Sequence, residues 1–135
     1  MVYIKEFKIT TGRDSLQCIT AEVEETIKKS GVRNGIAVVE AAHSTAGILK
    51  IASCGQEVLD DIVKEMRRLV PARINYLHQD SPENAAGHIK SSFYGSSLSL
   101  IIREGKLLCE GKQDIYLAEY DGPRKRTFSV CVMGE

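Results

Sequence analysis

Near the C-terminus the chain reads Thr127-Phe128-Ser129-Val130-Cys131-Val132-Met133, in which Phe128, Val130 and Val132 occupy every second position. This alternation is the period of a β-strand that buries one face. The turn sequence Asp121-Gly122-Pro123 stands shortly before it and suits a reversal of the chain. We therefore expect a strand over residues 127–133 that is entered through a turn.

More strands are expected on both sides of this one. Apolar residues favour strands over residues 98–103 and 114–120. At the N-terminus, Tyr3, Phe7 and Ile9 share one parity in an otherwise polar stretch, as in a half-buried strand. Strands are therefore expected at both ends of the chain, with several of them late in the sequence.

Two short apolar runs, residues 35–42 and 47–52, lie in the first half of the chain. We expect them to be strands that pair with each other around the intervening Ser44-Thr45-Ala46. This pairing would place His43 at a strand end, where functional groups commonly occur.

Two helices are expected between the strands. One follows Thr20 and ends at Gly31, a residue that commonly terminates helices. The second follows Ser53 and Gln56, which have the spacing of a capping box, and runs as far as Pro71. Helices set between terminal strands fit an α+β fold better than a repeated βαβ unit. We expect a single domain over residues 1–135.

Composition restricts the classes of partner. The chain has 135 residues, 43% of them hydrophobic, and a formal net charge of zero. A neutral chain of this kind argues against nucleic acid or an anionic membrane as the partner. Lys5, Glu6 and Lys8 interrupt any apolar run at the N-terminus, so we expect neither a signal peptide nor a membrane span, and a cytoplasmic location.

The chain has only three histidines, His43, His78 and His88, and all three lie in polar segments rich in small residues. Imidazole is both a common metal ligand and a proton carrier near neutral pH, so the three residues suggest a site. The alternative is that they are separate surface or hydrogen-bonded histidines, because no His-x-x-x-His motif is present. Two of them fall in the irregular stretch 76–95, which we interpret as a functional loop with a short helix.

The chain resembles the YjbQ-like family, small proteins described as secondary thiamine-phosphate synthases, over essentially its whole length. The motifs that carry the resemblance are His43-Ser44-Thr45-Ala46, Tyr76-Leu77-His78 followed by Asp80, Asn84-Ala85-Ala86-Gly87-His88-Ile89-Lys90-Ser91-Ser92, Gly95-Ser96-Ser97-Leu98, Gln113-Asp114-Ile115-Tyr116-Leu117-Ala118-Glu119, Asp121-Gly122-Pro123-Arg124-Lys125-Arg126 and Gly134-Glu135.

The resemblance implies an α+β fold with a large mixed, mostly antiparallel sheet and assembly as a homotrimer. It also implies that His43, His78 and His88 converge on a divalent metal, with zinc as the first candidate. The implied activity is weak thiamine phosphate synthesis, the condensation of a pyrimidine pyrophosphate with a thiazole phosphate. The ligand is therefore expected to be a small phosphorylated molecule.

Roles for the other motif residues follow from this hypothesis. Asp80 and Glu119 are the candidates to orient an imidazole or to accept a proton. Cations and hydroxyl groups are expected to hold the phosphates. The candidate substrate-binding residues are Thr45, Asn84, Lys90, Ser91, Ser92, Gln113, Arg124 and Arg126.

The chain departs from the family pattern at two places. Ile51-Ala52 replaces an Asn followed by an acidic residue, and Lys112 stands where the family has Trp in its Gly-x-Trp-Gln motif. Both changes remove groups that would line a ligand pocket. They favour an alternative, a trimeric binding or scaffold protein without catalysis, whose metal is structural or absent.

Overall fold

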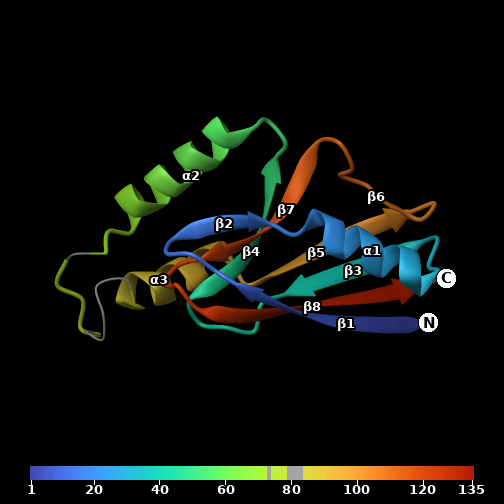
Figure 1. Ribbon diagram of the computed structural model, residues 1–135, viewed down its shortest axis with the longest axis horizontal. Coiled ribbons are helices and arrows are strands. Elements are labelled where there is room, and N and C mark those ends of the chain that lie inside the picture. The colour runs from blue at the N-terminus through green and yellow to red at the C-terminus, as the bar shows by residue number, and fades with distance from the viewer. Residues whose placement is uncertain (73, 79–83) are drawn as a thin grey trace.

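The computed structural model describes residues 1–72, 74–78 and 84–135 of the chain. Its strands form two antiparallel sheets, so the expected α+β fold with mostly antiparallel strands is confirmed, in two sheets instead of one (Figure 1). The larger sheet has the order β1 (Val2–Thr10), β8 (Lys125–Gly134), β3 (Gly35–Glu40), β5 (Ser97–Arg103) and β6 (Lys106–Leu107). The smaller sheet has the order β2 (Ser15–Cys18), β7 (Gln113–Glu119) and β4 (Ala46–Ala52). The helices are α1 (Thr20–Ser30), α2 (Gln56–Leu69) and α3 (Asn84–Tyr94).

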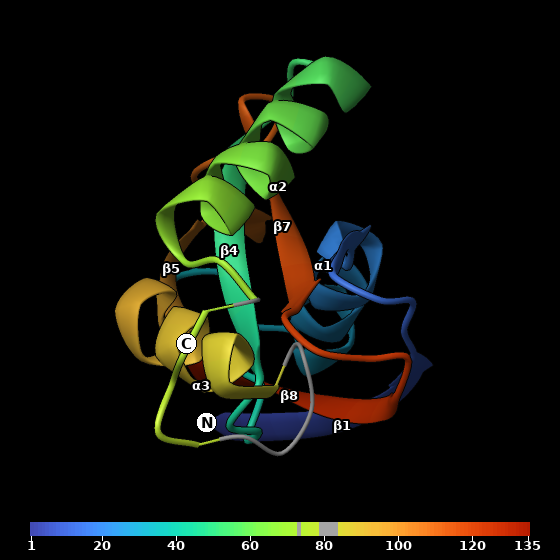
Figure 2. The same cartoon turned by 90° about the vertical axis from the view of Figure 1, so that its left-hand side faces the viewer.

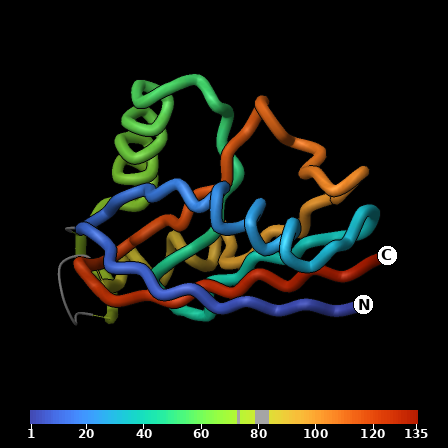
Figure 3. Tube along the Cα trace, turned by 45° about the vertical axis from the view of Figure 1, so that its right-hand side comes forward, coloured from blue at the N-terminus to red at the C-terminus, as the bar shows by residue number. Residues whose placement is uncertain are grey.

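The C-terminal strand β8 lies between β1 and β3 in the larger sheet. Phe128, Val130 and Val132 are buried, as their alternation predicts. Phe7 of β1 stacks on Phe128 with 5.1 Å between the ring centroids. The two ends of the chain lie side by side (Figure 3), and the N-terminal amine of Met1 donates to the Gly134 carbonyl.

The smaller sheet is the middle layer of the molecule (Figure 2). Ile48 and Leu117 on one of its faces join the main core, which α1 and the larger sheet complete. On the other face, Ala118 and Tyr120 pack with Met66 of α2 in a second, smaller core. The helix α1 ends where Gly31 adopts a left-handed conformation with φ of 75°, which confirms the expected stop.

The expected pairing of the strands over 35–42 and 47–52 is wrong. Both edges of β3 are hydrogen-bonded, one to β5 and the other to β8. The strand β4 therefore pairs with β7 in the other sheet. Residues 41–45 cross from one sheet to the other, and His43 lies on this crossing.

The expected capping box of the second helix is also wrong. The residue that precedes α2 is Gly55, and no side chain caps the helix there. Ser53 Oγ instead donates to Asp114 Oδ2 at 2.6 Å, a bond that attaches the loop to β7. Within the described residues, no helix is long and apolar enough to cross a membrane.

Candidate functional site

A buried ion pair lies where β7, β8 and the 41–45 crossing meet. Arg126 and Glu119 are only 5% and 1% exposed. Arg126 Nε donates to Glu119 Oε1 at 2.8 Å, and its Nη2 donates to Oε2 at 2.5 Å. Two parallel bonds of this kind are the strong, planar form of an arginine–carboxylate pair. Because both residues are inside the protein, the pair fixes the relative position of the two strands.

Both oxygens of Glu119 are occupied inside the fold. Thr11 Oγ1 donates to Oε1 at 2.5 Å, and the backbone N–H of Asp121 donates to Oε2 at 3.0 Å. Burial alone would raise the pKa of Glu119, but hydrogen bonds from Arg126, Thr11 and Asp121 outweigh burial and lower it. The structure therefore gives the predicted catalytic carboxylate the role of a fixed internal anion.

Thr45 and Arg126, both predicted to bind substrate, are bonded to each other. Arg126 Nη2 donates to Thr45 Oγ1 at 2.7 Å and to its carbonyl at 3.1 Å. Thr45 is itself buried, and its carbonyl also accepts from the backbone N–H of Tyr120. These two residues hold the sheet crossing next to β8.

The predicted phosphate-binding residue Lys90 is also internal. Its side chain is 1% exposed, and its Nζ lies 3.5 Å from Asp14 Oδ1. The other oxygen of Asp14 accepts from Arg67 Nε of α2. No sequence motif indicates Asp14, which lies in a short polar loop. It links α2 and α3 to the start of β2.

A chain of hydrogen bonds leads from Arg124 through Asp121 and Asn84 to the imidazole of His78. Arg124 Nη2 donates to Asp121 Oδ2 at 2.8 Å, and Asn84 Nδ2 donates to the same oxygen at 3.2 Å. Burial would raise the pKa of Asp121, but bonds from Arg124 and Asn84 outweigh it and lower the pKa. Asp121 is therefore an ionised acceptor.

This acceptor determines the tautomer of His78. Because the Asn84 amide nitrogen faces Asp121, its oxygen Oδ1 faces His78 Nε2 at 2.6 Å. An amide oxygen only accepts, so Nε2 of His78 carries the proton. In the neutral ring, the lone pair is then on Nδ1.

His88 is oriented in a comparable way from α3. Its Nδ1 lies 3.2 Å from the Ser44 carbonyl oxygen, which only accepts, so the lone pair of the neutral ring is on Nε2. The rings of His78 and His88 approach edge to face with 5.1 Å between centroids. Two imidazoles thus lie together, and each has one nitrogen fixed by an oxygen.

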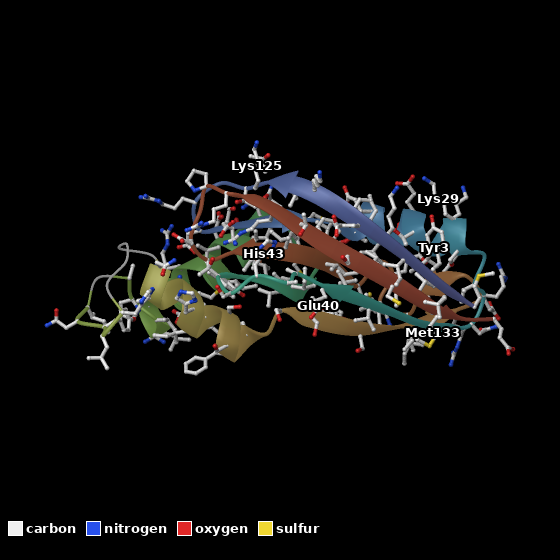
Figure 4. The ribbon with its side chains drawn as sticks, turned by 90° about the horizontal axis from the view of Figure 1, so that it is seen from below. Tyr3, Lys29, Glu40, His43, Lys125 and Met133 are labelled. Carbon is white, nitrogen blue, oxygen red and sulfur yellow. The ribbon has the colours of Figure 1, made fainter. Side chains whose placement is uncertain are left out.

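His43 has a different environment. It lies beside β8 (Figure 4). The backbone N–H of Thr127 donates to its Nε2 at 3.1 Å, so the proton of the neutral ring is on Nδ1. In this orientation His43 has no ring lone pair left for an ion. Among the residues that the structure describes, no group of three or more His, Cys, Asp or Glu side chains is arranged to hold a metal. Of the three histidines expected to converge on a metal, a single chain therefore brings His78 and His88 together, and His43 is bonded to Thr127 instead.

The remaining predicted residues divide between two places. Ser91 Oγ donates to the Ala46 carbonyl at 2.9 Å, and Ser92 Oγ donates to the His88 carbonyl at 3.0 Å, so both hydroxyls bond to backbone. Gln113 lies at the start of β7, in a separate cavity beside Lys50. Asp80 lies outside the described residues.

The fold and this site define a small α+β protein in which buried ion pairs support a pair of oriented imidazoles. The chain belongs to the UPF0047 YjbQ-like protein family, whose model matches residues 5–135. It is 39% identical to a UPF0047 protein of Methanocaldococcus jannaschii over 93% of this chain and 90% of that protein. It is 35% identical to the UPF0047 protein YugU of Bacillus subtilis over 93% of this chain and 94% of that protein.

Solved structures agree with this assignment. A YbjQ-like protein of unknown function from Sulfolobus solfataricus matches with a TM-score of 0.94 and 33% identity, over 100% of this chain and 99% of that one. A YjbQ/UPF0047 protein from Clostridium acetobutylicum matches with a TM-score of 0.90 and 36% identity, over 96% and 99%. The resemblance stated from the motifs is therefore confirmed at the level of the family and its fold.

Proposed function

We propose that this protein is a metal-binding enzyme that acts on a small phosphorylated compound, with His78 and His88 as protein ligands and zinc as the first candidate ion. The observation that carries the proposal is the pair of fixed tautomers. Each ring donates one N–H to an oxygen and keeps the lone pair of its other nitrogen, the arrangement usual for metal-ligating histidines. Water, substrate or a further side chain would supply the remaining ligands.

The surrounding residues suit this role in different ways. A bound divalent ion would neutralise charge on a phosphate oxygen. Arg124, whose side chain is half exposed, forms an ion pair with Asp121 at the outer end of the hydrogen-bond chain, and its guanidinium suits a phosphate in geometry and charge. Arg126, Glu119 and Lys90 act from inside as positioning residues. In this proposal, substrate selection depends on Arg124 and the imidazoles more than on the buried cations.

Metal content tests the proposal. Untagged protein purified without chelators should contain a stoichiometric divalent ion by elemental mass spectrometry, and His78→Ala and His88→Ala should lose it. The matched control is His43→Gln, which retains an acceptor for the Thr127 N–H and should retain the metal. Loss of the ion from all three variants would support the three-histidine set instead, whereas a wild type without metal would contradict the proposal.

Activity is tested separately. Condensation of a pyrimidine pyrophosphate with a thiazole phosphate should be detectable in the metal-loaded wild type and absent in His88→Ala. If the metal binds but no product forms, the enzymatic part of the proposal fails and the metal-binding part remains.

A second candidate is a trimeric, non-catalytic binding or scaffold protein. It is favoured by the outer face of the larger sheet, which no described helix covers (Figure 4). The strand register places Val2, Met133, Ile36 and Ile101 in one row across β1, β8, β3 and β5. All four side chains are about half exposed. An apolar row of this kind is typical of an association surface.

Light scattering tests this candidate. A homotrimer held by the row should become smaller when Ile36→Lys places a charge in its centre. Glu40→Lys, a charge change farther along the same face of β3, is the matched control. A wild type that is monomeric at all concentrations would exclude the trimer.

A further inference from the structure

A cavity with apolar and basic lining residues lies away from the imidazole pair, between β4 and β5. Its volume is about 290 Å³. Lys50 on β4 lines one side, and Lys112 and Gln113 line another from the loop that enters β7. Along β4, Lys50 lies four residues beyond Ala46, whose carbonyl accepts from Ser91 of α3, a separation of about 13 Å. The cavity therefore shares no residue with the imidazole pair.

The charge of this cavity is uncompensated. Its described lining includes Lys50 and Lys112 and no carboxylate. Neither lysine forms an ion pair with any residue that the structure describes. By contrast, the cavity between β2 and α2 contains acidic and basic residues in equal number, and the cavity at the end of α1 has two glutamates beside its three basic residues. The β4–β5 cavity thus has a net positive lining.

The backbone around both lysines is fixed. The N–H of Lys112 donates to the Cys109 carbonyl at 3.1 Å, and its own carbonyl accepts from Ser53 N–H at 3.0 Å. Lys50 lies in the middle of β4, opposite Ile115 of β7. Because the backbone is held by hydrogen bonds at both positions, the two lysine side chains start from fixed points on the wall of the cavity. A ligand would not have to order a loop in order to reach them.

We propose that this cavity binds a phosphate monoester with an apolar body. Two ammonium groups match the charge of a phosphate monoester near neutral pH, which approaches two negative charges. The Gln113 amide and the Ser99 hydroxyl are additional donors in the lining. Leu108, which is 55% exposed, provides apolar contact for the rest of the ligand. Lys112 is thus part of a phosphate site in this chain.

Phenyl phosphate is the probe that tests this site. Titrated at constant ionic strength, it should give saturable amide shifts in two-dimensional nuclear magnetic resonance spectra at β4, β5 and the loop before β7. Lys50→Gln and Lys112→Gln should each weaken its binding about tenfold, the loss of one charge-assisted hydrogen bond. The matched control is Lys106→Gln, which lines the cavity at the end of α1 and should bind as tightly as the wild type.

Further probes separate the parts of the ligand. Inorganic phosphate and benzoate should bind more weakly than phenyl phosphate, because the first lacks the apolar body and the second lacks one charge. Absence of saturable shifts, unchanged affinity in both lysine variants, or shifts confined to the surroundings of His78 and His88 would each overturn the inference. Both lysines are exposed, so the variants should fold as the wild type does, and their spectra without ligand verify this.

Discussion

Two regions of this molecule use basic residues in opposite ways. Near the imidazole pair, Arg126 and Lys90 are buried, and internal carboxylates compensate their charges. In the β4–β5 cavity, Lys50 and Lys112 are exposed and have no described ion-pair partner. The residue type is therefore a poor guide to function. A basic residue that is buried and ion-paired stabilises the fold, whereas an exposed basic residue without a described ion-pair partner can contact a ligand.

Replacing Glu119 should have the largest effect on the first region. Glu119→Ala leaves Arg126 buried without its carboxylate, and we expect a loss of about 3–5 kcal/mol in the free energy of unfolding. Urea denaturation measures it. The matched control is Glu110→Ala on the exposed turn before β7, which should stay within about 0.5 kcal/mol. Equal stability of the two variants would mean that the buried pair is not structural.

Acid should weaken the same region. The pKa values of Glu119 and Asp121 are lowered in the folded protein, so their contribution to stability is complete above the ordinary carboxyl pKa of about 4. It is lost as the pH falls through the lowered folded values. Stability measured from pH 7 to pH 3 should drop at the acid end, and less steeply in Asp121→Asn. A wild type as stable at pH 3 as at pH 7 would contradict this assignment.

The hydrogen bond between Asn84 and His78 should strengthen metal binding, so its removal should lower the affinity for zinc. Asn84→Ala removes the oxygen that fixes the tautomer of His78, and loss of such a partner typically weakens metal binding about 10–100-fold. Competition with a chromogenic zinc chelator measures the change. Ser92→Ala on the same helix, where Oγ bonds only to the His88 carbonyl among the described groups, is the control and should bind as the wild type does.

The close packing of α3 against the rest of the protein can be tested by adding a methyl group at Gly87. A Cβ on Gly87 would lie 2.9 Å from the Tyr120 carbonyl oxygen and 3.2 Å from the Thr45 side chain. We expect Gly87→Ala to cost about 1–3 kcal/mol through overpacking and to move His88. Gly12→Ala, whose Cβ would meet nothing closer than 3.8 Å, is the control. Similar melting temperatures for the two variants would show that α3 is not tightly seated.

The smallest effect is expected in the second region. Lys112→Gln should change the free energy of unfolding by less than about 0.5 kcal/mol, since the Lys112 side chain is exposed and forms no ion pair with a described residue. Thermal unfolding without ligand measures this. A large loss would mean that Lys112, like Arg126, is structural, and the contrast between the two regions would disappear.

Much of the fold could be predicted because local patterns determine it. The alternation of Phe128, Val130 and Val132 specifies β8, and Gly31 marks the end of α1. The same alternation in β8 also indicates a buried charged residue. Arg126 shares the parity of Phe128 and therefore points to the buried face of β8. A charged residue on that parity indicates an internal ion pair.

The pairing of β4 and the approach of the imidazoles could not be predicted from local patterns. Adjacent apolar runs favour a hairpin, yet β4 pairs with β7 because both edges of β3 are taken. His78 and His88 are ten residues apart, and their contact depends on the place of α3 against the smaller sheet. Such long-range packing leaves no periodic trace in the sequence.

We propose that His78 and His88 present defined lone pairs to one ion, and the ¹⁵N shifts of their rings measure this directly. Long-range proton–nitrogen spectra of the metal-free protein should show His78 protonated on Nε2 and His88 protonated on Nδ1. Added zinc should then move the resonances of His78 Nδ1 and His88 Nε2 together. Opposite tautomers, or zinc that leaves both nitrogens unchanged, would contradict a shared metal site at His78 and His88.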